Sequence, residues 1–440
     1  MDPDSLRIAL ISDHASPLAV LGGVDAGGQN VYVSEIGRCL ARRGHHVDVL
    51  TRCDDPARRG AVDVRPGLRV LHVEAGPARF VPKEQLLPYM NEFTRRTHRL
   101  MVHSRPYDVL HANFFMSGLV GLTLKRCLRV PLVTTFHALG LVRQQHQRGT
   151  DGFPVERIAI ERRLVHQSDR VVAECPQDQE DLQSLYGAPA SNIVTVPCGV
   201  DVERFRPLPK SQARARLGLP DDAFIVLQLG RLVPRKGIDN VIRAVGRLPA
   251  DINVSLMIVG GASAEPDERL TPEIGRLRSL AEQCDCAHRV QFMGSRHGPE
   301  LRTWYAAADV FVTTPWYEPF GITPLEAMAC GTPVIGSRVG GIQYSVVEGE
   351  TGFLVPPNDP DALAQRLELL YRQPLLARSM GARGVQRVRS TFTWERVTDD
   401  LLRVYAAVRP RRACSDAASA ASLRLVECGD EPVVRRGAVL

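Results

Sequence analysis

The stretch that decides the fold is Thr314-Pro-Trp-Tyr-Glu-Pro-Phe-Gly-Ile-Thr-Pro-Leu-Glu326. It follows the apolar run Val310-Phe-Val-Thr313, which predicts a strand, and its prolines and glycine predict a turn. The order Thr323-Pro-Leu-Glu326 is typical of a helix start with Thr323 as its cap. A helix N-terminus at the end of a strand suits a phosphate or another anion, because its N–H groups and dipole both favour negative charge.

Two carboxylates, Glu318 and Glu326, bracket this turn. On local grounds each has an ordinary alternative, since Glu326 can cap its own helix and Glu318 can be a solvated loop residue. The turn therefore predicts an anion site, and the roles of the two glutamates depend on what surrounds them.

Composition describes an ordinary soluble globular protein of 440 residues, with 44% hydrophobic and 24% charged residues. This length predicts two or three compact units. The net charge of +6 is spread along the chain without dense basic clusters, so nucleic acid is not indicated as a partner. The sequence contains no run of 18 apolar residues, so a transmembrane segment is not predicted. The N-terminus lacks the pattern of a secretory signal, and we therefore expect a cytoplasmic protein.

The N-terminal part reads as a Rossmann-like unit. Leu6–Ser12 predicts a buried parallel strand, Leu21–Gly28 a glycine-rich loop, Gln29–Arg43 a helix and His46–Thr51 a second strand. The loop is not GxGxxG, and the second strand ends without the acid that would hold an adenosine ribose. A dinucleotide site is therefore not expected here.

The same order of elements returns later in the chain. Strand 223–229 leads into the loop Gly230–Gly237, then a helix over 238–248 and a strand over 254–259. Alternation of this kind predicts the α/β class, with doubly wound parallel sheets and two Rossmann-like domains in tandem. The remaining elements that we expect in the first domain are strands at 107–112, 131–136, 170–175 and 193–197 and helices at 116–127 and 156–167.

The resemblance becomes specific at Glu318–Glu326, followed by Ala327–Ile335 and Gly340-Gly341. This run resembles the Glu-x7-Glu signature of retaining, sugar-nucleotide-dependent glycosyltransferases of family four. The resemblance covers about residues 6–408 and implies the GT-B fold, in which two Rossmann-like domains face an interdomain cleft. It implies an acceptor domain over 1–205, a donor domain over 206–391, a helix over 392–412 that crosses back, and a flexible tail over 413–440.

The same resemblance implies roles for individual residues. Glu318 faces the hydroxyls of the donor sugar, His137 reaches its C6 hydroxyl, and Glu326 binds the ribose of the nucleotide. Without the family, a lone histidine such as His137 is more often a satisfied structural residue, and loop cations such as Arg231 and Lys236 are more often solvated. The residues expected to bind the donor are Gly27, Gly28, Arg231, Lys236, Met293, Arg296, Phe320, Gly321, Ile322 and Glu326.

The segment Asp25–Val33 bears on the identity of the acceptor. It resembles the corresponding segment of inositol-phosphate N-acetylglucosaminyltransferases of the mycothiol pathway and of bacterial sucrose-phosphate synthases. Asn30, Lys83 and Arg157 match positions that hold the acceptor phosphate in the former group, while surface ion pairing is the alternative for the two cations. The chain departs from that group at Phe114 and Ala138, which replace hydroxyl-bearing residues. A sugar phosphate or another anionic acceptor is thus also open.

The expected activity is transfer of a hexosyl unit, glucose or N-acetylglucosamine, from a nucleoside diphosphate sugar, preferably UDP-linked, to a small hydroxyl acceptor. No cofactor is expected beyond this co-substrate. Ten cysteines without a CxxC pair, and no paired acidic motif beside the diphosphate, predict no metal. A homodimer is allowed by the resemblance, which leaves the oligomeric state undecided.

Other functions can be separated from this one. A nucleotide-sugar epimerase shares the fold, and a non-catalytic nucleotide-sugar binding protein would keep the donor contacts while losing His137 or Glu318. A nicotinamide-dependent oxidoreductase needs a true dinucleotide fingerprint. A pyridoxal-phosphate-dependent phosphorylase needs a Schiff-base lysine, and Lys236 is the only lysine after Lys210.

Overall fold

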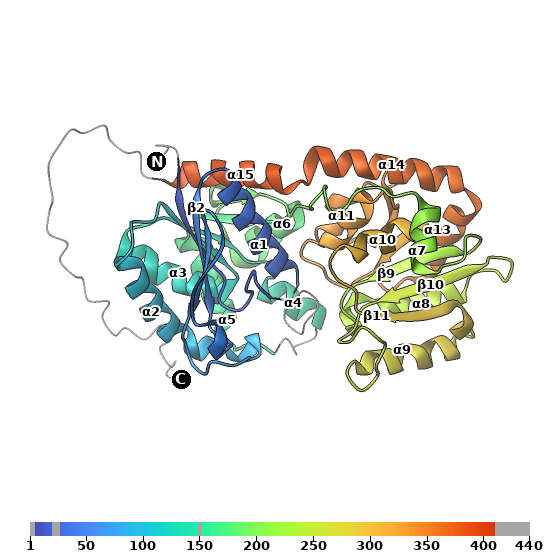
Figure 1. Ribbon diagram of the computed structural model, residues 1–440, viewed down its shortest axis with the longest axis horizontal. Coiled ribbons are helices and arrows are strands. Elements are labelled where there is room, and N and C mark those ends of the chain that lie inside the picture. The colour runs from blue at the N-terminus through green and yellow to red at the C-terminus, as the bar shows by residue number, and fades with distance from the viewer. Residues whose placement is uncertain (1–4, 20–26, 148–151, 410–440) are drawn as a thin grey trace.

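The computed structural model describes residues 5–19, 27–147 and 152–409, and it forms two α/β units that lie side by side (Figure 1). The predicted tail over 413–440 lies outside the described residues. In each unit, apolar strands form a buried sheet that is covered by helices on both faces, as alternating strands and helices require.

Within the described residues, the sheet of the first unit has eight strands in the order β3-β4-β2-β1-β5-β6-β7-β8. All pairings are parallel except that of β3 with β4, so the sequence missed an antiparallel hairpin at one edge. The strands are β1 (Arg7–Ile11), β2 (His46–Arg52), β3 (Gly60–Arg65), β4 (Leu68–Val73), β5 (Val109–Asn113), β6 (Leu132–Thr135), β7 (Arg170–Ala173) and β8 (Ile193–Thr195).

The second sheet is parallel throughout its described pairings, in the order β11-β10-β9-β12-β13-β14. In both sheets the order in which strands are added reverses beside the first strand, between β1 and β5 and between β9 and β12. Such topological switch points are where α/β sheets bind ligands. The strands are β9 (Phe224–Leu229), β10 (Val254–Val259), β11 (Val290–Gly294), β12 (Val310–Thr313), β13 (Val334–Ser337) and β14 (Gly352–Val355).

The helices connect these strands and follow the predicted ranges closely where predictions were made. Those of the first unit are α1 (Gly28–Arg42), α2 (Met90–Val102), α3 (Phe115–Leu128), α4 (Gly140–Gln147), α5 (Glu156–Gln167) and α6 (Pro176–Tyr186). Those that follow are α7 (Lys210–Leu217), α8 (Ile238–Gly246), α9 (Pro272–Gln283), α10 (Glu300–Ala307), α11 (Ile322–Ala329), α12 (Ile342–Ser345), α13 (Pro360–Arg372), α14 (Pro374–Thr391) and α15 (Trp394–Val408).

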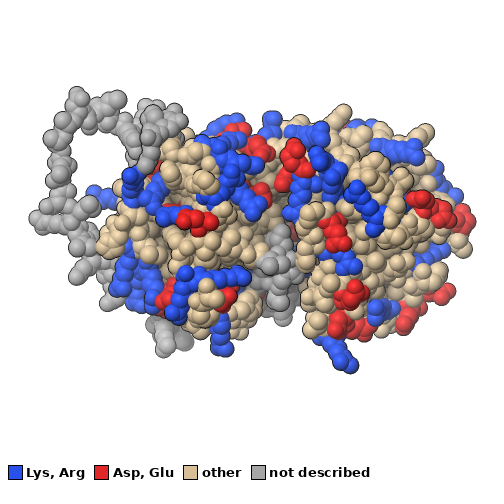
Figure 2. All heavy atoms as spheres, viewed as in Figure 1, with Lys and Arg blue, Asp and Glu red and all other residues tan. Residues whose placement is uncertain are grey.

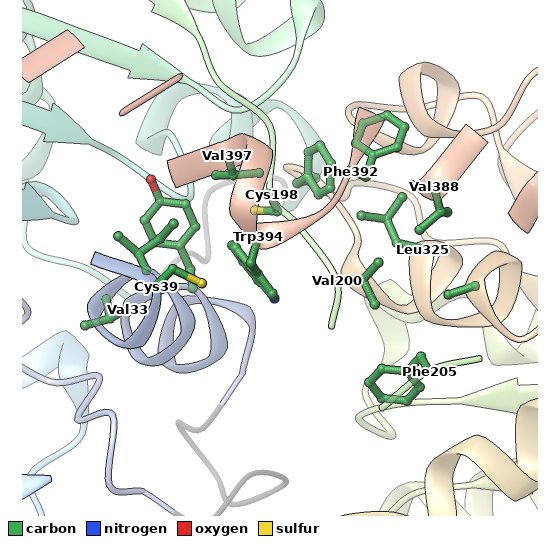
Figure 3. Packing of buried hydrophobic residues seen from close by; sticks show 14 of the residues in the cluster. Val33, Cys39, Cys198, Val200, Phe205, Leu325, Val388, Phe392, Trp394 and Val397 are labelled. Atoms are coloured by element: carbon green, nitrogen blue, oxygen red, sulfur yellow. The ribbon is translucent and has the colours of Figure 1, made fainter. Parts of the chain in front are cut away.

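The chain passes between the units twice, and the two passages touch each other. Val200 N donates a 2.8 Å hydrogen bond to Phe392 O, and the Trp394 indole packs on the backbone of Gly199. A Cβ at Gly199 would lie 2.7 Å from Trp394 Cδ2, so only glycine leaves room for the indole here. Figure 3 shows the side chains of Cys198, Val200, Phe392 and Trp394 gathered at this junction.

Helix α15 returns to the first unit and lies on α1 (Figure 1). Arg43 forms an ion pair with Asp399, and Arg42 Nη2 lies 3.0 Å from Glu395 Oε1. Beneath these exposed pairs, a 2.7 Å hydrogen bond joins the Tyr405 hydroxyl to Nδ1 of buried His111 on β5. Burial lowers the pKa of His111 to about 3, so this histidine is a neutral partner.

Charge is distributed as the composition indicated. Basic and acidic side chains are interspersed over both units on the face drawn in Figure 2. In the part of the chain that the structure describes, no helix combines the length and the apolar character needed to cross a bilayer.

We predict that Tyr405→Phe lowers the free energy of unfolding by about 1–3 kcal/mol, because it leaves the buried Nδ1 of His111 without its hydroxyl partner. Denaturant unfolding monitored by circular dichroism measures this loss. Tyr371→Phe is the matched control. The Tyr371 ring packs on Phe224, and its hydroxyl makes no hydrogen bond to another described residue. Equal stability of the two variants would contradict the prediction.

Candidate active site

Two loops of the second unit lie against each other at the topological switch point between β9 and β12. The loop after β9 runs through Gly230 to Gly237, and the loop after β12 runs through Thr314 to Gly321. Thr314 Oγ1 donates to Gly237 O at 3.0 Å, and Trp316 N donates to Arg235 O at 3.0 Å. Gly237 has a φ of +65°, and a Cβ there would collide with the backbone of Thr314.

Glu318 is neutralised by cations from the other loop. Its carboxylate forms an ion pair with Lys236, and its Oε2 lies 3.7 Å from Arg235 Nη1. Burial alone would raise the pKa of Glu318, but Lys236 and Arg235 outweigh burial and hold the pKa below its usual value. Burial lowers the pKa of Lys236, and Glu318 opposes this shift. The solvated-loop alternative is therefore wrong for Glu318 and Lys236, whose side chains are only 13% and 18% exposed.

Arg231 adds to the positive charge of this cluster, because it acts electrostatically on both Lys236 and Glu318. Within the described residues of the two loops, Arg235 and Lys236 are two cations beside the single carboxylate of Glu318. The strand-end loops thus present a net positive site, as an anionic ligand requires.

The start of α11 corrects the predicted cap. The helix begins at Ile322 with Gly321 as its N-cap, and no side chain caps it. Gly321 takes a φ of +89°, a backbone conformation that favours glycine at the N-cap. Since Thr323 lies inside the helix, the prediction of a capping box at Thr323 is wrong. Among the described residues no side chain caps this N-terminus, and uncapped N–H groups of this kind suit an anion.

Glu326 has a partner other than its own helix. The Tyr305 hydroxyl donates a 2.7 Å hydrogen bond to Glu326 Oε2. Burial raises the pKa of Glu326, with Tyr305 and Arg204 opposing the shift. The Glu326 side chain is half-buried, and the Tyr305 hydroxyl holds its carboxylate through one oxygen, Oε2.

Of the glycine-rich loop predicted over 21–28, only Gly27 and Gly28 belong to the described residues, and they lie at the start of α1. Gly27 is the N-cap of α1, and its N–H donates to Asn30 Oδ1 at 2.9 Å, while Asn30 Nδ2 donates to Ser16 O at 3.0 Å. A Cβ at Gly28 would meet only Ile322 Cδ1 at 3.7 Å, so the starts of α1 and α11 lie across from one another. Asn30 itself is buried and bound to the loop that it supports.

His137 follows β6 with its backbone in the left-handed region, at a φ of +58°. Its Nδ1 lies 2.8 Å from Glu174 Oε1, and its Nε2 lies 2.9 Å from Asn113 Oδ1. The Tyr32 ring meets the imidazole edge to face at a centroid distance of 4.9 Å. Both ring nitrogens are therefore bonded within the first unit.

A cavity of about 280 Å³ lies between the units beside Glu318. It is bordered by α4 and the start of α6 on one side and by the Glu318 loop on the other, where His146 and Tyr317 stack at 5.6 Å. Burial, with a further contribution from Glu174, raises the pKa of Asp178 in this cavity to about 8. The carboxyl of Asp178 is thus mostly neutral at pH 7.

Lys83 and Arg157, two acceptor candidates of the first unit, each meet a carboxylate of the protein. Lys83 is partly exposed, and its Nζ lies 3.4 Å from Glu84 Oε1. Arg157 is only 1% exposed and pairs with Glu161 at 2.7 Å, so the alternative of a surface ion pair is wrong for this residue. Its Nη2 also donates to Ala138 O at 2.6 Å.

Three donor candidates are held mainly by the protein. The Phe320 side chain is buried beside Phe392, which leaves only its backbone to contact a ligand. Arg296 Nη1 donates to Ala264 O at 2.7 Å and to Ser295 O at 2.9 Å. Met293 is partly buried against the core.

Comparisons with known proteins agree with this geometry. The pattern "Glycosyl transferases group 1" matches residues 209–387, and "Glycosyltransferase Family 4" matches residues 26–204. The D-inositol 3-phosphate glycosyltransferase 1 of Catenulispora acidiphila is 40% identical over 401 residues, which is 91% of this chain and 95% of that protein. The D-inositol 3-phosphate glycosyltransferase of Corynebacterium diphtheriae is 36% identical over 96% of this chain and 99% of its own length.

The chain belongs to the group 1 glycosyltransferases.

Its fold agrees with this assignment. The sucrose-phosphate synthase of Thermosynechococcus elongatus superposes with a TM-score of 0.84 at 35% identity, covering 91% of this glycosyltransferase and 98% of that chain. Anabaena HepE, solved with UDP and glucose, gives a TM-score of 0.71 at 21% identity and supports the fold alone. The GT-B fold predicted from the resemblance is confirmed, and an epimerase, an oxidoreductase, a phosphorylase or a purely binding protein is not supported.

Sequence reasoning missed several residues that hold the glycosyltransferase site together. Arg235 and Tyr305 are the protein partners of Glu318 and Glu326, and Asn113 and Glu174 are those of His137. Asn113 ends β5 and Glu174 directly follows β7, so their place at the carboxyl ends of strands was the one signal available. Among the described residues, no group of three or more His, Cys, Asp and Glu side chains could hold a metal ion.

We predict that Asp178→Asn gains stability relative to the wild type as the pH rises. The folded-state pKa of about 8 exceeds the ordinary value of 3.8, so folding takes up a proton that the unfolded chain does not hold. The wild-type protein therefore loses stability, relative to the variant, between about pH 4 and 8, and the difference levels off above pH 8.

Urea unfolding at pH 5, 7 and 8.5 measures this difference. Asp221→Asn, at an exposed position, is the control and should show no such trend. A difference between Asp178→Asn and wild type that is independent of pH would refute the prediction.

Proposed function

We propose that the chain moves a hexosyl unit, glucose or N-acetylglucosamine, from a UDP-linked sugar to a hydroxyl group of a small acceptor, with retention of the anomeric configuration. The observation that carries this proposal is the pair of cations, Arg235 and Lys236, that faces the single carboxylate of Glu318 beside the start of α11. A leaving nucleoside diphosphate gains negative charge as its bond to the sugar breaks, and preorganised cations and N–H groups stabilise that charge.

The remaining site residues take the roles that the family resemblance implies. Glu326 accepts from the ribose hydroxyls, Glu318 faces the hydroxyls of the sugar, and His137 reaches toward its C6 hydroxyl from the first unit. Since the leaving phosphate can accept the proton of the acceptor on the same face, no protein nucleophile is required. The two glutamates are thus not the acid and base pair of a glycoside hydrolase.

The acceptor that we propose is a sugar phosphate or an inositol phosphate. The named relatives act, by their names, as inositol 3-phosphate glycosyltransferases and as a sucrose-phosphate synthase. Lys83 is a partly exposed cation of the first unit that suits such a phosphate. Activity in the cytoplasm and a homodimer stay predictions.

The test is a screen of purified protein with UDP-, ADP- and GDP-sugars, each with and without inositol phosphate, sugar phosphates and free sugars. Release of nucleoside diphosphate that depends on one donor and one acceptor supports the proposal, and the configuration of the product is then read by NMR. No acceptor-dependent release with any pair, despite tight donor binding, would overturn it.

The three carboxylate and imidazole residues should separate donor binding from turnover. We predict that Glu326→Ala weakens UDP-sugar binding about 10- to 100-fold, because a charged hydrogen bond to the ligand is lost. His137→Ala and Glu318→Ala should lower kcat more than they weaken binding. Calorimetric Kd values and steady-state rates measure both effects, and an equal loss of donor affinity in all three variants would refute this division of labour.

We also predict that activity does not require a divalent cation. The cations that face the donor site are side chains, Lys236 and its arginine neighbours, and these supply the charge stabilisation that a metal would otherwise give. Transfer should therefore proceed at an unchanged rate in excess EDTA. Activity lost with the chelator and restored by added Mg²⁺ or Mn²⁺ would show the prediction to be wrong.

A further inference from the structure

The histidine of the candidate active site is held in a chain of three buried or nearly buried side chains. Glu174 follows β7 and is only 3% exposed, and Asn113 ends β5 and is fully buried. The His137 imidazole lies between them, 2.8 Å from Glu174 Oε1 and 2.9 Å from Asn113 Oδ1. A carboxylate and an amide oxygen therefore face the two ring nitrogens.

The orientation of the Asn113 amide is fixed by its own surroundings. Its Nδ2 faces two carbonyl oxygens, Ile11 O at 3.4 Å and His111 O at 3.3 Å. A flipped amide would place Oδ1 against these acceptors and would leave Nδ2 toward the imidazole. Since only Nδ2 can donate to carbonyl oxygens, Oδ1 is the atom that faces His137, and Nε2 must carry the hydrogen between them.

The contact on the other side of the ring also requires a hydrogen. Glu174 Oε1 accepts from Cys198 Sγ at 3.2 Å as well as meeting His137 Nδ1, so two donors converge on this oxygen. A neutral imidazole has only one N–H, which cannot serve Asn113 and Glu174 at once. The two contacts are satisfied together when both ring nitrogens are protonated and Glu174 is the counter-ion.

We propose that Glu174 is a positioning residue for His137, which fixes the orientation of the imidazole and keeps a proton on both of its nitrogens. The reaction it serves is the proposed transfer, in which His137 faces the donor sugar. A ring fixed in this way, with both nitrogens bonded, offers a C–H edge and a positive charge to the donor sugar, whereas a free imidazole would rotate and exchange tautomers.

Among the described groups around the ring, Glu174 is the matching charge. Tyr32 on α1 meets the imidazole edge to face, and His111 on β5 is neutral. Asp178 on α6 accepts from Glu174 N at 2.9 Å, but its carboxyl is mostly neutral at pH 7. The left-handed backbone at His137 is disfavoured for most residues, and the anchored side chain offsets that cost.

The test compares wild type with Glu174→Gln, which keeps the size of the side chain and removes its charge. In this variant the glutamine amide donates to Nδ1, and Nε2–H still donates to Asn113, so the ring becomes neutral in the same place. Imidazole ¹⁵N NMR of the free protein should show both nitrogens of His137 protonated in the wild type and Nε2 alone protonated in the variant. His137→Asn, which tolerates the left-handed backbone, identifies the signals by their loss.

In steady-state transfer, Glu174→Gln should lower kcat about tenfold or more with a smaller change in the KM of the donor, because a charge-assisted hydrogen bond has been removed. Glu180→Gln, at an exposed position of α6, is the matched control and should change neither the ring spectrum nor kcat. A wild-type ring with one unprotonated nitrogen, an unchanged spectrum in Glu174→Gln, or a kcat within twofold of wild type overturns the proposal. The NMR result needs no substrate, so it is separate from a failure of the proposed transfer.

Discussion

The ion pair between Glu318 and Lys236 is the interaction on which the donor half of the site depends. Lys236 follows β9 and Glu318 follows β12, so the pair joins the two loops at the topological switch point of the sheet. Taking both charges out of water costs several kcal/mol, and the cost is recovered only because Arg235 and loop backbone groups add further bonds. The Glu318 carboxylate thus holds two cations, Lys236 and Arg235, in place at once.

The first unit is aligned with that site through the second passage of the chain. The Trp394 indole fits only because Gly199 has no side chain, and this contact fixes where α15 begins. From there α15 lies along α1 and is joined to it by Arg42 and Arg43. Since α1 starts at Gly28, the packing of a helix near the end of the described chain sets how Gly28 faces Ile322.

Much of the fold was readable from the sequence, because buried strands are apolar runs that alternate with helical stretches. The site residues His137, Lys236 and Glu318 were located through the family resemblance, which places them in loops at strand ends. Their partners were not, since Glu174 is 37 residues from His137 and no local pattern links them. The prediction of a cap at Thr323 was wrong because burial of Phe320 and the left-handed backbone of Gly321 set the helix start. The hairpin of β3 and β4 was missed because its outer strand, β3, is mostly exposed.

The acceptor side differs from the donor side in how its charge is used. Arg157 is neutralised by Glu161, which also accepts from the Tyr186 hydroxyl and from Gly140 N. Both departures from the inositol-phosphate group meet this guanidinium, because the Phe114 ring lies 5.2 Å from it and Ala138 O accepts its Nη2. The Phe114 ring stands where a hydroxyl-bearing side chain would offer a donor, whereas the carbonyl of residue 138 would be present with either side chain. The buried arginine of the first unit is thus held by a carboxylate, an aromatic ring and a backbone carbonyl, while Lys236 of the second unit is held by one carboxylate.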